Sequence, residues 1–436
     1  MLVTDSFEEG SNEGMEPLAS DFVEVFRSPH PETVYAYSPG IARLPGGRLV
    51  VTMDLGGPGV ERRLEGVKGK KKGRDRSWQG KIFTSDDGGE TWDHRANYPF
   101  LHARPFLAGD SLYVLGQADD LKVIRSQDDG ESWTEPRKLT EGQSWHQAPS
   151  NVHYANGCVY LVMERRVYTD VQGWNVNGTA PVLMRGDVEK DLCERENWTF
   201  ASELPFREAV EVDQLDYFGV PFFSMEPKKG IEVAPGRGMA PIGWLETNVV
   251  QFRDSDHYWY DPQGKTFHLW MRAHTGGTGY AAIAKVVEQE PGAGEMTTKL
   301  EKVPSGKRIL YVPCPGGQMK FHILYDEKSR LFWLLSSQAT DSMTKAEELP
   351  SDRYGLPNNE RHRLQLHFSK NCIDWCFAGL VDKGDSPGES RHYASMVIDG
   401  EDLHILSRSG DEEAKNAHDT NFISFHTVED FRELVY

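Results

Sequence analysis

The chain has 436 residues, with 48 Lys and Arg against 67 Asp and Glu, which gives a formal net charge of −19 at pH 7. This balance argues against a protein that binds nucleic acid or an anionic membrane, because such binding depends on clustered basic side chains. No stretch approaches the roughly 18 consecutive apolar residues that a membrane-spanning helix requires, so we expect no membrane partner.

The first residues and the cysteines bear on location. Residues 1–20 are acidic and lack the apolar core of about 7–15 residues found in signal peptides, so we expect an N-terminal tail there. The five cysteines are odd in number and too few for a disulfide framework, which favours a reducing compartment. We therefore expect a cytoplasmic protein, or a secreted one that has lost its leader.

Composition favours an all-β chain. The sequence contains 42 Gly and 24 Pro, and its 11 Trp, 16 Tyr and 20 Phe occur among short apolar runs separated by glycine-punctuated turns. Helical periodicity is confined to two short segments, 342–349 and 428–434.

One unit recurs along the chain: a polar or aromatic cluster, a short apolar strand, a turn and a strongly apolar strand. Most of these turns have the Gly-Gly, Gly-Asp, Asn-Gly or Asp-Gly composition that closes β-hairpins. Six such hairpins predict a six-bladed β-propeller that occupies residues 21–436 as a single domain, with a degenerate seventh blade within 203–238 as the alternative. The units begin at Ser38, His102, His146, Trp244, Gly316 and Arg391.

A ring of blades also needs a closing contact. The segment 21–26 has the pattern of a strand and can pair beside the strand 422–425 of the last blade. We expect this pairing to join the two ends of the chain and hold the ring shut.

Two segments match the motif S-x-D-x-G-x-[ST]-W, at 85–92 and 126–133, and a shortened copy lies at 369–375. In each, the Asp can accept backbone N–H bonds within a turn, the Gly permits a positive φ, and the Trp can pack beneath the turn. We expect structural turns between outer strands, far from any chemistry.

These motifs resemble those of the sialidase (neuraminidase) family of Asp-box propellers, and the resemblance spans roughly residues 34–428. It implies a six-bladed propeller with an active site at its axis. It also implies a tyrosine nucleophile activated by a glutamate, an aspartate acid/base, and three arginines that bind the substrate carboxylate.

Three site positions follow from the fourth and sixth hairpins. Family members carry a glutamate at the head of the fourth inner strand and an arginine at the end of the next strand, and Glu246 and Arg272 match these positions. Glu246 begins one apolar strand and Arg272 ends the strand paired with it, so both can reach one pocket, where a half-buried carboxylate suits the activation of a phenol. In the last blade Tyr393 matches the nucleophile, and its ordinary pKa of about 10 requires a base such as Glu246.

Two further positions are matched by spacing. Arg361 precedes the shortened motif at the family's distance, with Arg363 as a competitor on the same face of an alternating strand. Asp75, in a basic loop before the first Asp box, matches the acid/base, and Asp54 is the alternative. The basic loop itself is either a solvated segment or a lid that attracts an acidic sugar.

One departure from the family concerns the substrate. Ser38 stands where the family's first arginine belongs, which removes one of the stronger contacts to a carboxylate. Arg104 in the second blade is a candidate replacement. Without such a replacement, the substrate is a different sugar.

Inner-strand starts converge on one face of a propeller, and here they are rich in Arg, His and Trp, as a carbohydrate pocket requires. No residues have the spacing of a convincing metal or phosphate site, so we predict neither metal nor cofactor. The residues expected to contact the sugar include His102, Arg104, Trp145, His146, Trp244 and Arg391. Other polar residues at strand starts and ends are Glu164, Arg165, His274, Lys320, His322, Gln338, His392 and Arg408.

Three functions fit these residues. The first, which we predict, is a retaining exo-glycosidase of the sialidase type, in which Tyr393 attacks the anomeric carbon with Glu246 as its base. The second is a polysaccharide lyase in which His146 or His102 removes the C5 proton beside a uronic acid. The third is a non-catalytic propeller that binds carbohydrate or protein. The expected partner is an acidic carbohydrate, and the oligomeric state is left open.

Overall fold

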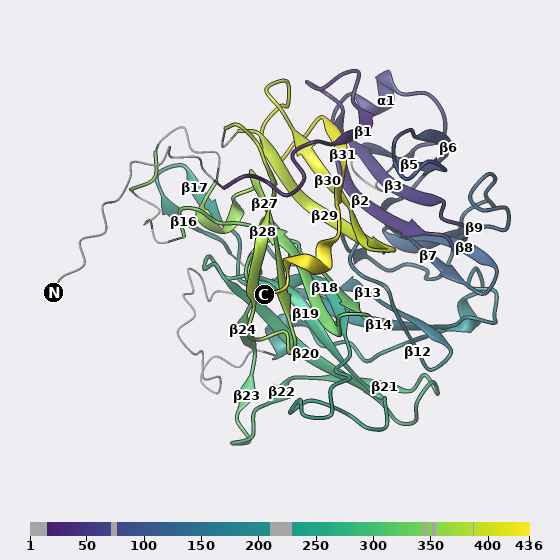
Figure 1. Ribbon diagram of the computed structural model, residues 1–436, viewed down its shortest axis with the longest axis vertical. Coiled ribbons are helices and arrows are strands. Elements are labelled where there is room, and N and C mark those ends of the chain that lie inside the picture. Colours follow the sequence, from purple (N-terminus) through teal and green to yellow (C-terminus); the bar gives the residue numbers. More distant parts are fainter. Residues whose placement is uncertain are drawn as a thin grey trace.

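The computed structural model describes residues 15–70, 76–209, 229–342, 344, 348–350, 355–386 and 388–436. Six antiparallel sheets stand around a common axis, so the predicted six-bladed propeller is confirmed (Figure 1). The six predicted hairpins supply the inner strands of the six blades. In the described residues, no helix is both long and apolar enough to span a membrane.

The first three blades follow one another along the chain. Blade 1 contains β2 (Tyr35–Arg43), β3 (Leu49–Gly56), β4 (Gly69–Lys70), β5 (Ser77–Ser85) and β6 (Asp93–Tyr98). Blade 2 contains β7 (Leu101–Ala108), β8 (Ser111–Ala118), β9 (Asp120–Ser126) and β10 (Arg137–Lys138). Blade 3 contains β11 (Trp145–His146), β12 (His153–Ala155), β13 (Cys158–Arg166), β14 (Thr179–Asp187) and β15 (Trp198–Phe200).

The other three blades complete the ring. Blade 4 contains β18 (Gly243–Val250), β19 (Thr266–His274), β20 (Tyr280–Glu288), β21 (Met296–Lys299) and β24 (Tyr311–Pro313). Blade 5 contains β25 (His322–Asp326), β26 (Leu331–Ser337), β27 (Arg363–Ser369) and β28 (Cys376–Lys383). Blade 6 contains β29 (Ser390–Asp399), β30 (Asp402–Gly410), β31 (Phe422–Val428) and β1 (Val23–Arg27).

Few elements lie outside the blades. Two small hairpins are β16 (Ile231–Ala234) with β17 (Arg237–Met239) and β22 (Glu301–Lys302) with β23 (Arg308–Ile309). The short helices are α1 (Val60–Arg63) and α2 (Phe206–Ala209), and the described 3₁₀ turns are η1 (Arg195–Asn197), η4 (Pro357–Asn359) and η5 (Phe431–Leu434).

These elements bear on the possible seventh blade and on the two segments with helical periodicity. The region 203–238 holds only α2 and part of the β16–β17 hairpin among its described residues, and the six blades are complete without it. The helical pattern at 428–434 is a single 3₁₀ turn, η5, because β31 continues to Val428. The pattern at 342–349 falls partly outside the described residues.

The ring is closed as predicted, by pairing between the two ends of the chain. Strand β1 runs antiparallel to β31, with Val23 opposite Phe425 and Arg27 opposite Phe422. Figure 1 shows the first strand beside the C-terminal blade. The buried side chain of Val25 packs in an apolar cluster that also contains Val34 of the segment leading into blade 1. The closing strand therefore joins blade 6 to blade 1 by packing as well as by hydrogen bonds.

The motif turns lie between the outer strands of blades 1, 2 and 5. In the first, Asp87 accepts hydrogen bonds from the Thr91 N–H at 3.0 Å and the Ser85 hydroxyl at 2.7 Å. Trp92 donates its indole N–H to the Gly89 carbonyl at 3.1 Å. The turn at 126–133 has the same set of bonds around Asp128. None of these turn residues lines the central cavity of the described structure.

Candidate active site

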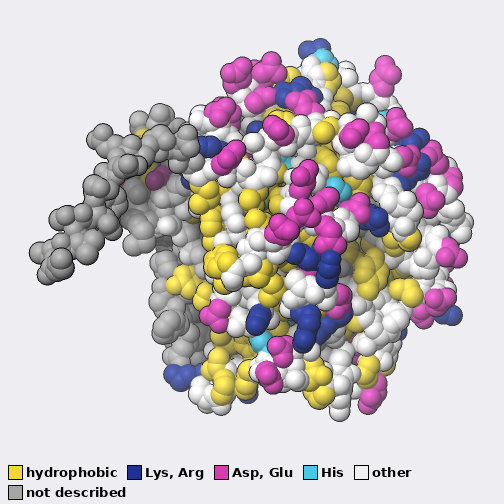
Figure 2. Space-filling view, in the orientation of Figure 1, with side chains coloured by type: hydrophobic (Ala, Val, Ile, Leu, Met, Phe, Trp, Pro, Cys, Tyr) yellow, Lys and Arg dark blue, Asp and Glu magenta, His cyan; other side chains and the backbone are white. Residues whose placement is uncertain are grey.

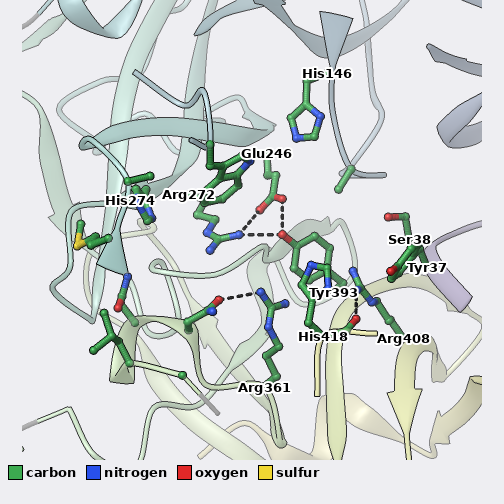
Figure 3. A pocket seen from close by; sticks show the side chains of 18 of the residues that line it. Tyr37, Ser38, His146, Glu246, Arg272, His274, Arg361, Tyr393, Arg408 and His418 are labelled. Carbon is green, nitrogen blue, oxygen red and sulfur yellow. Dashed lines mark hydrogen bonds and ion pairs between the residues drawn. The ribbon is translucent and has the colours of Figure 1, made fainter. Parts of the chain in front are cut away.

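A cavity of about 740 Å³ opens at the propeller axis. Blades 1, 2, 3, 4 and 6 contribute side chains from their strands, and the segment that leads into β27 contributes from blade 5. Figure 3 shows the residues that point into it. The side chains used below are Tyr37, Ser38, His102, His146, Trp174, Glu246, Arg272, Arg361, Tyr393, Arg408 and His418.

Four of these residues share an unusual backbone. Ser38, His102, Glu246 and Tyr393 have φ values of 49°, 53°, 57° and 50°, and each lies where a register shift interrupts the pairing of an inner strand. Such β-bulges re-aim a side chain that regular alternation would point elsewhere. Left-handed backbone in non-glycine residues costs about 1–3 kcal/mol each and concentrates at functional sites. The same distortion at four blades marks the cavity as the candidate active site.

Tyr393, Glu246 and Arg272 form a closed hydrogen-bonded triangle (Figure 3). The Tyr393 hydroxyl donates to Oε1 of Glu246 at 2.6 Å, and Nη1 of Arg272 donates to the same hydroxyl at 2.8 Å. Arg272 also donates to Oε2 of Glu246 at 3.2 Å, and its Nε is fixed by the Gln318 carbonyl at 2.8 Å. Burial raises the pKa of Tyr393 and the negative charge of Glu246 raises it further, against Arg272 and Arg361.

Two more arginines flank the phenol. The guanidinium carbon of Arg361 lies 5.6 Å from the centre of the Tyr393 ring, and that of Arg408 lies 5.2 Å from it. Arg408 also stacks on Tyr37 at 4.1 Å. Glu246 is the one carboxylate among the described lining residues. The cavity is therefore a cationic site in an acidic protein, whose surface carries many Asp and Glu side chains (Figure 2).

Histidines line two sides of the cavity. His102 and His146 meet edge to face at 5.2 Å, and Nδ1 of His102 is 2.7 Å from the Gln117 amide. Burial lowers the pKa of His102 to about 3, so its imidazole is neutral near pH 7. On the other side, Nδ1 of His418 lies 2.8 Å from Asp419, and burial followed by the charge of Arg408 lowers the pKa of His418 to about 4.

Four sequence-predicted residues lie outside the cavity. Arg104 donates to the Asn151 and Val162 carbonyls, because the β7 bulge directs His102 and not Arg104 towards the site. Trp145 and Trp244 are buried core residues in the spaces beside blades 3 and 4. Arg391 pairs with Asp382 at 2.5 Å.

Of the two acid/base candidates predicted from the sequence, Asp54 lies among the described residues. Asp75 lies outside the described residues. The alternative, Asp54, is buried behind the cavity wall, where it accepts the His102 N–H at 2.6 Å. Burial raises the pKa of Asp54 well above its usual range. The competitor Arg363 donates to Gln338 at 3.2 Å and does not line the cavity, whereas Arg361 does.

The lining residues that the sequence did not assign to the site include Arg408, His418 and Trp174. Arg408 ends β30 and was visible only as one of several polar strand ends. His418 and Trp174 lie in the β30–β31 and β13–β14 connections, where no periodic pattern exists to place them. Trp174 is 36% exposed, and Arg272 lies over its ring at 4.9 Å. An exposed indole at the rim of a cavity is a surface on which a sugar ring can stack.

No protein-family model matches the sequence, and no curated protein matches it significantly. Among solved structures, the fold is similar to that of a Hadza microbial sialidase, with a TM-score of 0.52 and 14% identity over 94% of this chain and 68% of that chain. It is similar to Trypanosoma rangeli sialidase in complex with the inhibitor DANA, with a TM-score of 0.51 and 13% identity over 96% and 59% of the two chains. A protein of unknown function from Dyadobacter fermentans matches with a TM-score of 0.51 and 12% identity over 95% and 99%. Identities this low establish a shared fold alone.

Proposed function

We propose that the protein is a retaining exo-glycoside hydrolase that acts on a carboxylate-bearing sugar, sialic acid or a related acidic sugar. The observation that carries this proposal is the 2.6 Å hydrogen bond from the Tyr393 phenol to Glu246, in a cavity where Arg272, Arg361 and Arg408 surround the phenol. The sialidase structures with the same fold support it.

The proposed mechanism gives each group a role. Glu246 accepts the phenolic proton while the Tyr393 oxygen attacks the anomeric carbon, and the bond from that carbon to the leaving oxygen breaks. A neutral phenol approaches an anionic sugar without the repulsion that a carboxylate nucleophile would meet. Water then cleaves the glycosyl–tyrosine bond, and the configuration is retained. Asp75 is the residue that the family resemblance implies as proton donor to the leaving oxygen.

The substrate carboxylate is held by the arginines. Arg272 and Arg361 match the family positions, and Arg408 approaches Tyr393 from the neighbouring strand β30. Ser38 occupies the place of the missing family arginine and lines the cavity beside Tyr37, on which Arg408 stacks. Arg408 therefore supplies the third guanidinium from a different blade than the family does.

A lyase acting beside a uronic acid is the second candidate. The observation in its favour is the pair of imidazoles, His102 and His146, that meet at 5.2 Å on the cavity wall, of which His146 is the candidate base for a C5 proton. The arginines would neutralise the uronate in that reaction as well.

One experiment separates these functions. Wild type, Tyr393→Phe and Glu246→Gln proteins are incubated with aryl sialosides, aryl uronides and uronate-containing oligosaccharides. We expect release of the aryl group from an acidic glycoside, with a first-formed sugar of unchanged anomeric configuration by NMR, and loss of turnover in Tyr393→Phe. Absorbance from an unsaturated uronate would instead establish the lyase. Binding without product would establish a lectin, and full activity in a folded Tyr393→Phe protein would refute the tyrosine mechanism.

A further inference from the structure

A buried ammonium group lies directly behind the strand that carries the proposed nucleophile. Lys320, in the segment that leads into β25, is 1% exposed. Its Nζ donates to the carbonyl of Ala394, the residue after Tyr393, and to Oγ of Ser395 at 3.1 Å. Blade 5 thus reaches the β29 strand of blade 6 through a charged side chain.

The β29 bulge explains why this contact is needed. In the register of β29 against β30, His392 and Ser395 are paired, whereas Tyr393 and Ala394 have no partner. The Ala394 carbonyl is therefore removed from the ladder in a region where Ala394 itself is 3% exposed. A buried carbonyl without a donor is costly, and Lys320 supplies the donor. The neighbouring His322 also contacts β29, since its Nδ1 accepts the Met396 N–H at 3.1 Å.

The charge of Lys320 is a second observation. No described carboxylate forms an ion pair with it, and an unpaired buried ammonium is unfavourable compared with an apolar residue of the same size. The charged groups that face it are Glu246 from β18 and Arg104 from β7, and the titratable His322 follows two residues later at the start of β25. Burial lowers the pKa of Lys320 to about 7, against the attraction of Glu246. The ammonium therefore changes charge within the working pH range of most enzymes.

We propose that Lys320 is a positioning residue that holds the Tyr393 bulge, and with it the phenol, in line with Glu246 while its ammonium is protonated. The kinetic part of this inference rests on the proposed function, and the spectroscopic part does not. Loss of the proton weakens the bond to the Ala394 carbonyl and removes a positive charge from behind Glu246. We therefore expect the fall in rate at alkaline pH to follow the loss of the proton from Lys320.

The kinetic test compares Lys320→Met and Lys320→Arg with Lys328→Met, an exposed lysine whose partner is Glu401. Misplacement of a reacting group by about 1 Å can cost about 10²-fold in rate, so we expect kcat to fall about 10- to 100-fold in Lys320→Met. KM changes little, because Lys320 does not line the cavity. Lys320→Arg restores part of kcat and moves the alkaline limb to higher pH, and Lys328→Met behaves as wild type. A folded Lys320→Met protein with the wild-type kcat and pH profile overturns the proposal.

The second test needs no turnover. Protein labelled with 3-fluorotyrosine is observed by ¹⁹F NMR, and Tyr393→Phe identifies the Tyr393 signal. We expect this signal to respond to pH near 7 in wild type and to be shifted and insensitive to pH there in Lys320→Met. If the signal behaves so while no glycoside is cleaved, the proposed function fails and the inference stands. If Lys320→Met does not fold, Lys320→Arg serves, and a wild-type pH response in that variant overturns the inference.

Discussion

The phenol oxygen of Tyr393 lies 2.6 Å from the Glu246 carboxylate, although 147 positions separate the two residues in the chain. Tyr393 belongs to blade 6 and Glu246 to blade 4, and both sit on left-handed bulges. Arg272 donates to both partners. The pair thus exists only because the ring brings two distant strands to one axis, and its electrostatics can be tested directly.

The first prediction concerns the ionisation of this phenol. Because the negative charge of Glu246 raises the pKa of Tyr393 and Arg272 lowers it, Glu246→Gln lowers that pKa and Arg272→Met raises it. Ultraviolet difference titration of each protein against its Tyr393→Phe counterpart isolates the signal. Shifts in the same direction for both variants would contradict the arrangement described here.

The second prediction compares two arginines. Arg408 faces the cavity, and Arg104 is buried among backbone carbonyls. Loss of a charge-assisted contact costs about 1.5–3 kcal/mol, so Arg408→Met raises KM for an acidic sugar about 10- to 100-fold. Arg104→Met lowers the melting temperature and leaves KM within about twofold. Steady-state kinetics and thermal unfolding of both variants provide the check, and equal KM values would remove Arg408 from the site.

A third prediction concerns the buried Glu164, whose Oε1 accepts the N–H and the hydroxyl of Thr247. Burial raises the pKa of Glu164 to about 8, compared with about 4.3 for an unfolded chain. Between pH 5 and 8, the folded protein holds a proton that the unfolded chain has lost, so this group lowers the free energy of unfolding as pH rises, by at most about 1.4 kcal/mol per pH unit. Glu164→Gln removes this dependence and gains stability relative to wild type towards pH 8.

Glu301 is a control for Glu164, because its pKa is shifted in the opposite direction. Burial raises the pKa of Glu301, but hydrogen bonds from His268 and Lys285 outweigh burial and lower this pKa to about 2. The stability that this carboxylate contributes is present above its unfolded pKa, so Glu301→Gln destabilises the protein near pH 7. Denaturant unfolding between pH 5 and 8 distinguishes the two residues. A constant difference between wild type and Glu164→Gln across that range would show that Glu164 is ionised throughout.

The fourth prediction uses two equivalent glycines of the motif turns. Gly89 and Gly130 have φ values of 99° and 90°, so alanine costs about 1–2 kcal/mol at either site. A Cβ at Gly89 would lie 2.2 Å from the Phe425 ring of β31, whereas at Gly130 the nearest atom is 3.5 Å away. Overpacking adds about 1–3 kcal/mol at the first site only. Gly89→Ala should therefore unfold at clearly lower denaturant concentration than Gly130→Ala, and identical midpoints would contradict the contact between blades 1 and 6.

The propeller was predictable because each blade leaves a local record. In hairpins such as β2–β3 and β29–β30, the sequence shows an alternating strand, a turn and a strongly apolar strand. The strand pattern at 21–26 predicted the closure of the ring. The motif residues Asp87 and Asp128 make bonds within their own turns. Such features depend on neighbouring residues, so they can be read from sequence.

The cavity was less predictable because it depends on bulges. His102 and Arg104 are two residues apart and would share a face on a regular strand. The bulge between Leu101 and Arg104 breaks that alternation, so His102 reaches the cavity and Arg104 does not. The place of Arg408 beside Tyr393 is a tertiary relation between two strands, and the connection that carries His418 has no pattern that fixes its path. Glu246, Arg272 and Tyr393 were predicted from the family resemblance, because strand alternation alone does not identify them as cavity residues.

The closing strand has a consequence for biosynthesis. Val23 leaves the ribosome about 400 residues before its partner Phe425. At about 5–20 residues per second, translation separates them by about 20–80 seconds. During that interval the first strand is an unpaired edge, which is prone to aggregation, and the blade that carries Tyr393 does not yet exist. The central cavity therefore cannot form before blade 6 is synthesised, and the first strand stays unpaired until then.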